Sequence, residues 1–71
     1  MTKDELERGK SYCFGLVSGE EVCGIYKGSK TIDDHDMFIV ERSYENPITK
    51  SIETFTILVS KYNVETIVLY D

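Results

Sequence analysis

The chain has 71 residues with a formal net charge of −5, and 41% of its residues are hydrophobic. This length allows one domain, residues 1–71, and the composition is that of a folding chain rather than a disordered one. So small a domain buries only about 60% of the surface of its unfolded chain, and oligomerisation, a disulfide or a metal commonly adds stability. The acidic charge argues against general binding to phosphate backbones.

The first ten residues and the lengths of the apolar runs are used to predict the cellular compartment. Residues 1–10 are charged rather than apolar, which is not the pattern of a signal peptide. No apolar run approaches the length of about 20 residues that a membrane-spanning helix needs. We therefore expect a cytoplasmic protein with no membrane partner.

A short helix is predicted at residues 2–9. Thr2 and Glu5 have the spacing of a capping box, and Gly9 suits the left-handed residue that ends a helix. Little of this segment is apolar, so the helix needs the rest of the domain to persist.

The next segment predicts a β-hairpin that carries the two cysteines. Side chains alternate from Ser11 with a period of two, which is typical of strands. If the turn lies at residues 19–20, Cys13 is opposite Tyr26 rather than opposite Cys23. We therefore expect free thiols, with a bridge as the open alternative, because two cysteines are too few for a secreted disulfide scaffold.

Alternation and turn residues predict five strands in all. Gly24 within the second strand indicates a sharp bend of the kind that a small closed barrel requires. A polar loop is expected at residues 29–36, a turn at 45–48 and a tight reversal at 60–63. The strands are expected at residues 11–17, 21–27, 37–42, 52–59 and 64–70.

Two small barrels fit this order of elements. An OB-fold usually has a helix between its third and fourth strands, and residues 43–50 are too short for one and contain Pro47. The predicted fold is therefore all-β with a short N-terminal helix: a five-stranded, strongly bent antiparallel barrel of the Sm-like, SH3 type. Another five-stranded barrel is the alternative.

Three motifs carry a resemblance to the Sm and Sm-like superfamily. A glycine pair spaced by five residues, Gly19 and Gly24, comes just before a bent strand, and Ile39-Val40-Glu41 is similar to the end of the family's third strand. Residues 59–67 resemble its second signature, an apolar strand, a short turn, Asn63 and a β-branched strand. The resemblance covers residues 11–70 and implies one Sm-like domain.

The resemblance is weakest at the family's RNA site. RNA-binding members hold a base with an aspartate and an asparagine between strands two and three, and with a basic residue and a glycine before the last strand. In this chain the asparagine position falls on Asp36 or Met37, and the basic position falls on Ser60, with Lys61 next to it. The fold resemblance therefore does not bring the RNA site with it.

Four residues are nevertheless the predicted ligand-binding or RNA-binding set. Tyr62 would stack on a base, Lys61 would contact a phosphate, and Asp36 and Asn63 would bind base edges. In the alternative interpretation, Tyr62 covers the end of the barrel and Lys61 faces water.

Neither a metal site, a cofactor nor catalysis is predicted. Asp33, Asp34, His35 and Asp36 form the densest set of potential metal ligands, but a loop of this composition is more often solvated. No serine or cysteine has a base that can be placed beside it, and His35 has no orienting group. We expect a protein that is not an enzyme.

The last strand indicates assembly. Residues 64–70 carry apolar side chains on both faces, and an exposed strand of this kind pairs readily with another chain. In Sm-like proteins the fourth strand of one subunit pairs with the fifth of its neighbour, so the resemblance implies a hexameric or heptameric ring of identical subunits. A monomer with Ile67 or Leu69 under the N-terminal helix is the alternative.

Two functional hypotheses remain open. The first is a non-catalytic, ring-forming Sm-like homo-oligomer that binds RNA or a nucleotide-like ligand. The second is an acidic small-barrel interaction module or inhibitor, which binds another protein by strand pairing or through its negative surface.

Overall fold

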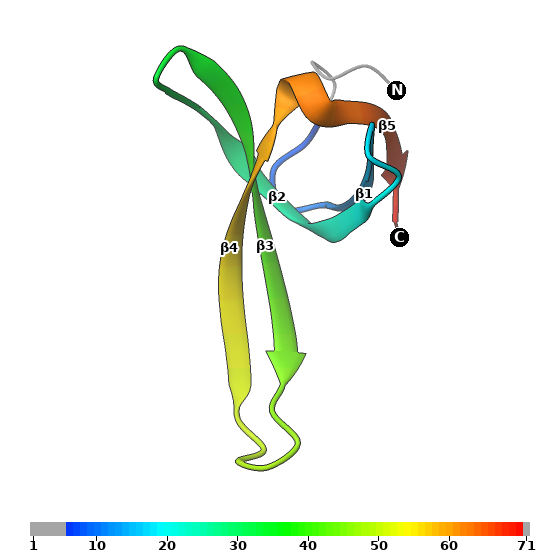
Figure 1. Cartoon of the computed structure of the whole chain (residues 1–71). Coiled ribbons are helices and arrows are strands. Elements are labelled where there is room, and N and C mark those ends of the chain that lie inside the picture. The colour runs from blue at the N-terminus through cyan, green and yellow to red at the C-terminus, as the bar shows by residue number, and fades with distance from the viewer. Residues whose placement is uncertain (1–5, 71) are drawn as a thin grey trace.

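The computed structural model describes residues 6–70 as a single five-stranded antiparallel sheet (Figure 1). The order of the strands in the sheet is β4-β3-β2-β1-β5. Within the described residues β4 and β5 do not pair with each other, so the sheet is open and these strands form its two edges. The elements are β1 (Ser11–Leu16), β2 (Glu21–Ile32), β3 (His35–Glu45), β4 (Ile52–Ser60), the 3-10 turn η1 (Lys61–Asn63) and β5 (Val64–Leu69).

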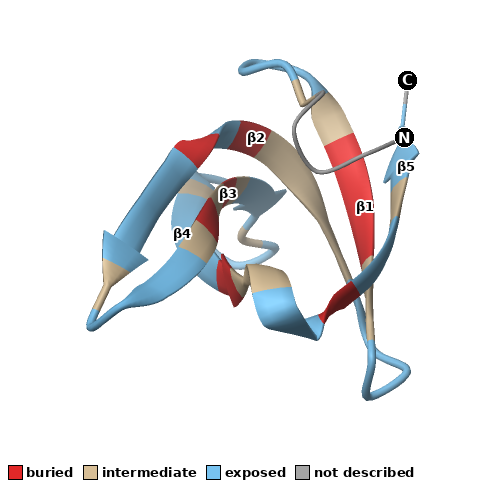
Figure 2. Cartoon of the chain, turned by 90° about the horizontal axis from the view of Figure 1, so that it is seen from above, coloured by how far each residue is buried: buried red, intermediate tan, exposed pale blue. Residues whose placement is uncertain are grey.

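The core is an aromatic cluster enclosed by the curved sheet. Alternate residues of a strand point to the same face, so Tyr12 and Phe14 of β1 enter the core together. The ring of Phe38 lies with its centroid 5.2 Å from that of Phe14 and 5.9 Å from that of Tyr26. Figure 2 shows that buried residues are confined to the curved part of the sheet. The core residues are Tyr12, Phe14, Tyr26, Phe38, Val40, Val59 and Val64.

Two glycines allow β2 to curve around this core. A Cβ atom added to Gly24 would lie 2.7 Å from the carbonyl oxygen of Glu41, so the close approach of β3 leaves no room for a side chain. Gly28 has a φ of 132°, and the pairing register with β3 shifts between Tyr26 and Gly28. The bend predicted from Gly24 therefore has a physical basis in the contact with β3.

The prediction of five strands is confirmed, but the polar loop predicted at residues 29–36 is wrong. Strands β2 and β3 continue through this segment, and Ile32 pairs with His35. Only Asp33 and Asp34 form the turn, with φ values of 49° and 65°. Aspartate tolerates this left-handed conformation better than most residues, which explains why a tight turn forms without glycine.

The predicted N-terminal helix is not confirmed. Residues 2–5 lie outside the described residues, and Leu6–Gly9 are irregular with a turn at Arg8 and Gly9. The segment is tied to the sheet instead, because Gly9 N donates to the Tyr26 carbonyl oxygen at 2.9 Å. Within residues 6–70, none of the helical structure is long or apolar enough to cross a lipid bilayer.

The prediction of free thiols is also wrong, because Cys13 and Cys23 form a disulfide. The turn lies earlier than predicted: Gly19, with a φ of 94°, donates its N–H to the Leu16 carbonyl oxygen at 2.9 Å. This three-residue loop shifts the register of the hairpin and places Cys13 directly opposite Cys23.

Candidate interaction surface and ligand site

The outer halves of β3 and β4 form an arm, residues 42–55, that projects from the curved body of the sheet (Figure 1). The pairs Phe38–Val59 and Val40–Ile57 lie on the core-facing side of the two strands. Because the side-chain period of a strand is two, the pairs Arg42–Phe55 and Tyr44–Glu53 lie on that same side farther along. The face that lines the core therefore continues onto the arm.

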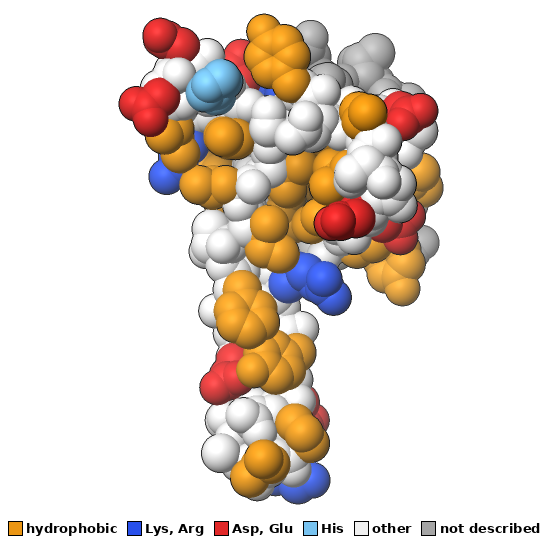
Figure 3. Space-filling view, in the orientation of Figure 1, with side chains coloured by type: hydrophobic (Ala, Val, Ile, Leu, Met, Phe, Trp, Pro, Cys, Tyr) orange, Lys and Arg blue, Asp and Glu red, His pale blue; other side chains and the backbone are white. Residues whose placement is uncertain are grey.

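The body of the domain does not cover this continuation. Phe55 is 50% exposed and Tyr44 is 43% exposed, whereas Phe38 and Val40 are fully buried. The two exposed rings stack on each other, with centroids 5.1 Å apart and an interplanar angle of 16°. Apolar side chains are visible along the arm in Figure 3. An apolar face without a cover is typical of an interaction site.

A groove of about 370 Å³ lies along this face of the arm. It is lined by Arg42, Ser43, Tyr44, Phe55 and Ile57. The lining combines two aromatic rings and an aliphatic side chain with one guanidinium group, a combination that is common where another chain docks. Sequence reasoning missed this groove, because Tyr44 and Phe55 follow the same alternation as the core residues and no local signal marks where the core ends.

The Tyr44 hydroxyl donates a hydrogen bond to the Glu53 carboxylate across the arm. This hydrogen bond, with a smaller contribution from desolvation, raises the pKa of Tyr44 above its ordinary value of 10.0. The physical reason is that a phenolate would lose the hydrogen bond and face the negative charge of Glu53. The pair fixes the orientation of the tyrosine ring on the apolar face.

The two edge strands are open to pairing with another chain. Natural edge strands are commonly blocked by lysine, proline or bulges. Strand β4 reads IETFTILVS and β5 reads VETIVL, so each holds one glutamate and neither holds lysine or proline. In the part of the chain that the structure describes, the one irregularity at these edges is a register shift in the β1–β5 pairing between Gly15 and Leu16. On and just beyond β5, Val68 and Tyr70 are 60% and 68% exposed. Within residues 6–70, both edges therefore have one side that pairs with no other strand, and both carry exposed apolar side chains.

The four residues of the predicted ligand site lie near one end of the molecule. Met37 pairs with Ser60 at the end of the β3–β4 ladder. Asp36 and Lys61 are the next residues beyond that pair, and Tyr62 and Asn63 follow in η1. The structure thus brings together residues from the β2–β3 hairpin and η1 that are far apart in the sequence.

Each of these residues already has a defined environment. The Asp36 carboxylate accepts a hydrogen bond from the Thr31 hydroxyl at 2.8 Å, and Lys61 Nζ lies 5.1 Å from the centroid of the Phe38 ring. The backbone oxygen of Asn63 accepts a hydrogen bond from Val17 N at 2.8 Å. Tyr62 is 81% exposed, so it does not cover the core, and its ring is open to a ligand.

The acidic residues beside this end do not gather as metal ligands. Asp33 and Asp34 form the β2–β3 turn, and the following His35 and Asp36 are exposed. Within residues 6–70, the one group of three potential ligands that lie close together is Cys13, Glu21 and Cys23. The sequence did not point to this group, because the predicted register kept the cysteines apart.

No protein-family model, curated protein or solved structure matches this chain.

Proposed function

We propose that this chain is a non-catalytic assembly protein, a homo-oligomer in which β4 of one copy pairs with β5 of the next. The observation that carries the proposal is the pair of edge strands at opposite sides of one open sheet, both with exposed apolar side chains and neither with lysine or proline. The edges differ in sequence, so their pairing is head-to-tail, and repeated head-to-tail contacts close into a ring when the rotation permits.

The uncovered arm supports the same proposal. A subunit that adds its β5 to the β4 edge comes to lie beside the groove of Tyr44, Phe55 and Ile57. Burial of apolar area contributes about 25 cal/mol per Å², so covering these side chains adds to the free energy of backbone pairing. The Sm-like barrel is the fold we propose for the assembled subunit, with a hexameric or heptameric ring as the form that the resemblance implies.

The solution mass tests this proposal, and a single lysine at an edge tests its geometry. Val68 and Val17 are both exposed valines, at 60% and 66%, but only Val68 belongs to an edge strand. Light scattering behind a sizing column is expected to give a mass of six or seven chains for the wild type and for Val17→Lys. The Val68→Lys variant is expected to give a mass close to one chain. A wild-type monomer would overturn the proposal.

A ligand site at the end formed by η1 and the β2–β3 turn is the second candidate function. The exposed ring of Tyr62 favours it, because a base can stack on an open aromatic face. Nearby Asp33, Asp34 and Asp36 repel a phosphate backbone, so the proposed ligand is a short RNA segment or a nucleotide rather than a long duplex. In a ring, each subunit would contribute one copy of this site.

Titration with a fluorescent oligonucleotide at several salt concentrations tests the ligand site. Tyr62→Ala is expected to weaken binding at every salt concentration, since stacking is worth about 1–3 kcal/mol per base. Lys61→Ala is expected to reduce the slope of log K against log salt by about one, the value for one phosphate contact. Binding that is indifferent to both substitutions would place the ligand elsewhere. Ile48→Ala, at a residue that is 89% exposed and lies outside both edge strands, is the control.

A protein partner is the alternative to self-assembly. A chain that stays monomeric by mass would leave the interaction module or inhibitor as the better hypothesis, with the same edge strands as its contact surface.

A further inference from the structure

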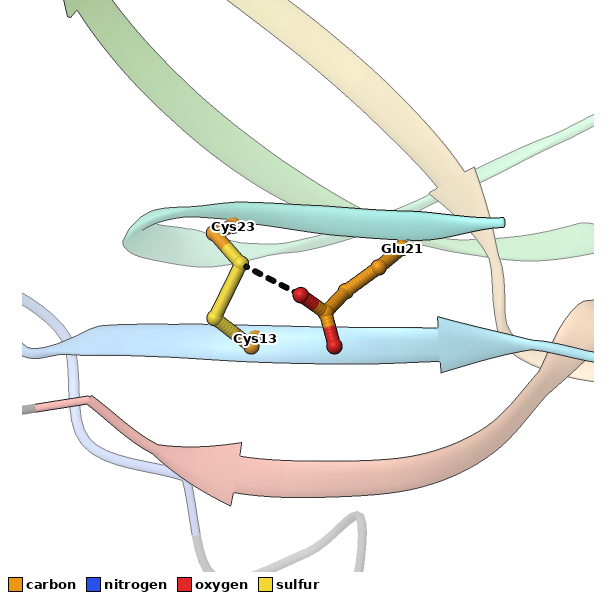
Figure 4. Close-up of side chains that lie close together, drawn as sticks. All are labelled: Cys13, Glu21 and Cys23. Atoms are coloured by element: carbon orange, nitrogen blue, oxygen red, sulfur yellow. Dashed lines mark hydrogen bonds between the residues drawn. A yellow bond between two sulfur atoms is a disulfide. The ribbon is translucent and has the colours of Figure 1, made fainter. Parts of the chain in front are cut away.

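A cluster of two sulfur atoms and a carboxylate lies on the outer face of the β1–β2 hairpin. Cys13 and Cys23 are directly opposite each other, with their Cα atoms 4.0 Å apart. Glu21 is two residues before Cys23 and therefore points to the same face. One ligand atom from each of the three residues lies within 4.8 Å of the others. Figure 4 shows the Glu21 carboxylate directed at the sulfur atoms, with Oε1 3.5 Å from Cys23 Sγ.

The core does not account for this placement. The buried cluster is formed by side chains from all five strands, to which β1 and β2 contribute Tyr12, Phe14 and Tyr26 from their opposite face. Cys13 is buried too, but neither cysteine belongs to this cluster. No ion pair within residues 6–70 involves Glu21. Its carboxylate lies close to the sulfur atoms of Cys13 and Cys23 instead. The three residues thus form a compact group whose geometry the packing of the core does not require.

Two thiolates and a carboxylate are a donor set that suits zinc. Zinc binds Cys sulfur at about 2.3 Å and carboxylate oxygen at about 2.0–2.2 Å in a tetrahedral arrangement, and water fills the position that the protein leaves open. Cys23 also lines a shallow depression of about 210 Å³ on the surface, which gives an ion a path from solvent. Cys13 lies on β1, and Cys23 and Glu21 lie on β2, so the three donors come from two neighbouring strands.

We propose that Cys13, Glu21 and Cys23 form a zinc site when the disulfide is reduced, so that this face exists either as a disulfide or as a zinc thiolate centre. Reduction by a dithiol breaks the S–S bond: the two sulfur atoms take up two electrons and two protons, and the dithiol becomes a cyclic disulfide. Zinc then displaces the two thiol protons and binds two thiolates, the Glu21 carboxylate and one water molecule. Exchange with a small-molecule disulfide re-forms the Cys13–Cys23 bond and releases the ion: the small disulfide takes up the two electrons and, with two protons from water, leaves as two thiols.

Cobalt(II) is the probe for this site, because its bonds to thiolates give a near-ultraviolet charge-transfer band. The full chain is reduced with dithiothreitol, freed of reductant under argon and titrated with cobalt chloride. We expect the band to saturate at one cobalt ion per chain and to vanish when zinc is added. The oxidised chain is expected to show no band.

Substitutions separate this site from adventitious binding. Glu21→Gln is expected to weaken cobalt binding by about tenfold or more, since even the loss of a group that only supports a metal ligand typically costs 10–100-fold. Glu20→Gln removes the adjacent exposed carboxylate and is expected to leave binding unchanged. Cys23→Ser is expected to abolish the band, with circular dichroism as the control for folding.

Two results would overturn the proposal: a reduced wild-type chain with no thiolate band, or equal affinity in wild type and Glu21→Gln. Because the readout is an absorption band rather than a mass, it is independent of whether the chain assembles.

Discussion

The Cys13–Cys23 disulfide allows a quantitative prediction of stability. The bridge joins residues 10 apart in the sequence, so it closes a short loop. In the chain-entropy model, closing a loop of this size lowers the conformational entropy of the unfolded chain by about 9 cal/mol/K. At 25 °C this loss stabilises the folded state by about 2.7 kcal/mol. For a domain of this length, 1 kcal/mol corresponds to about 4–8 °C in Tm, so reduction should lower Tm by about 10–20 °C.

Thermal unfolding followed by circular dichroism, with and without dithiothreitol and with EDTA in both samples, checks this value. The chelator is needed because a metal bound by the reduced chain would restore part of the lost stability. The double variant Cys13→Ser, Cys23→Ser should unfold near the Tm of the reduced wild type and should not respond to reductant. Equal Tm values for the oxidised and reduced wild type would refute the entropic reasoning. Free thiols in the denatured protein as purified would refute the bridge itself.

Three further predictions concern the core, the bend and the arm. Phe38→Ala should destabilise the domain by about 3–5 kcal/mol in urea unfolding, because the fully buried ring leaves a cavity. Gly24→Ala should cost about 1–3 kcal/mol in the same assay, because the new Cβ meets the backbone oxygen of Glu41 and neither strand can yield freely. Tyr44 should ionise above pH 10 in a difference titration of absorbance against Tyr44→Phe, and Glu53→Gln should lower that pKa by removing the carboxylate.

Much of the sheet could be predicted from local signals. The alternation that starts at Ser11 and the β-branched residues from Val64 place two strands correctly. Gly24 could be assigned to a bend because glycine inside a strand often marks a bulge, a tight bend or a close approach of another backbone. These features depend on residues close together in the sequence, which is why pattern alone finds them.

The errors come from backbone conformations that short-range patterns do not determine. The φ values of Asp33 and Asp34 make a two-residue turn, and the strands extend accordingly into what reads as a polar loop. In the β1–β2 hairpin, Gly19 is the last residue of a three-residue loop rather than the first residue of a two-residue turn. This difference places Cys13 opposite Cys23. A slip in register changes every cross-strand neighbour, so one wrong turn also hid the group of Cys13, Glu21 and Cys23.

The candidate surfaces also include some features that local sequence predicts and others that depend on the three-dimensional structure. Exposure of Tyr62 could be anticipated from its place in a tight reversal, and exposed apolar side chains at β5 could be anticipated from the apolar residues on both faces of that strand. Assembly through this strand stays a prediction. The groove on the arm could not, because its apolar residues have the same alternation as core residues. Only the three-dimensional extent of the body shows that Val40 is covered while Phe55 is not.

The sulfur pair and the proposed assembly edge lie on neighbouring strands, yet they are expected to act separately. Cys13 pairs with Val68, so the β1–β2 disulfide holds the strand against which β5 packs. The N–H and C=O groups of β5 that the proposal pairs with another subunit point away from β1. Opening the S–S bond therefore removes none of these groups. A reduced chain that keeps its oligomeric mass would support this separation. A reduced chain that dissociates, while unfolding at the Tm expected for loss of the bridge alone, would instead mean that the hairpin positions the edge.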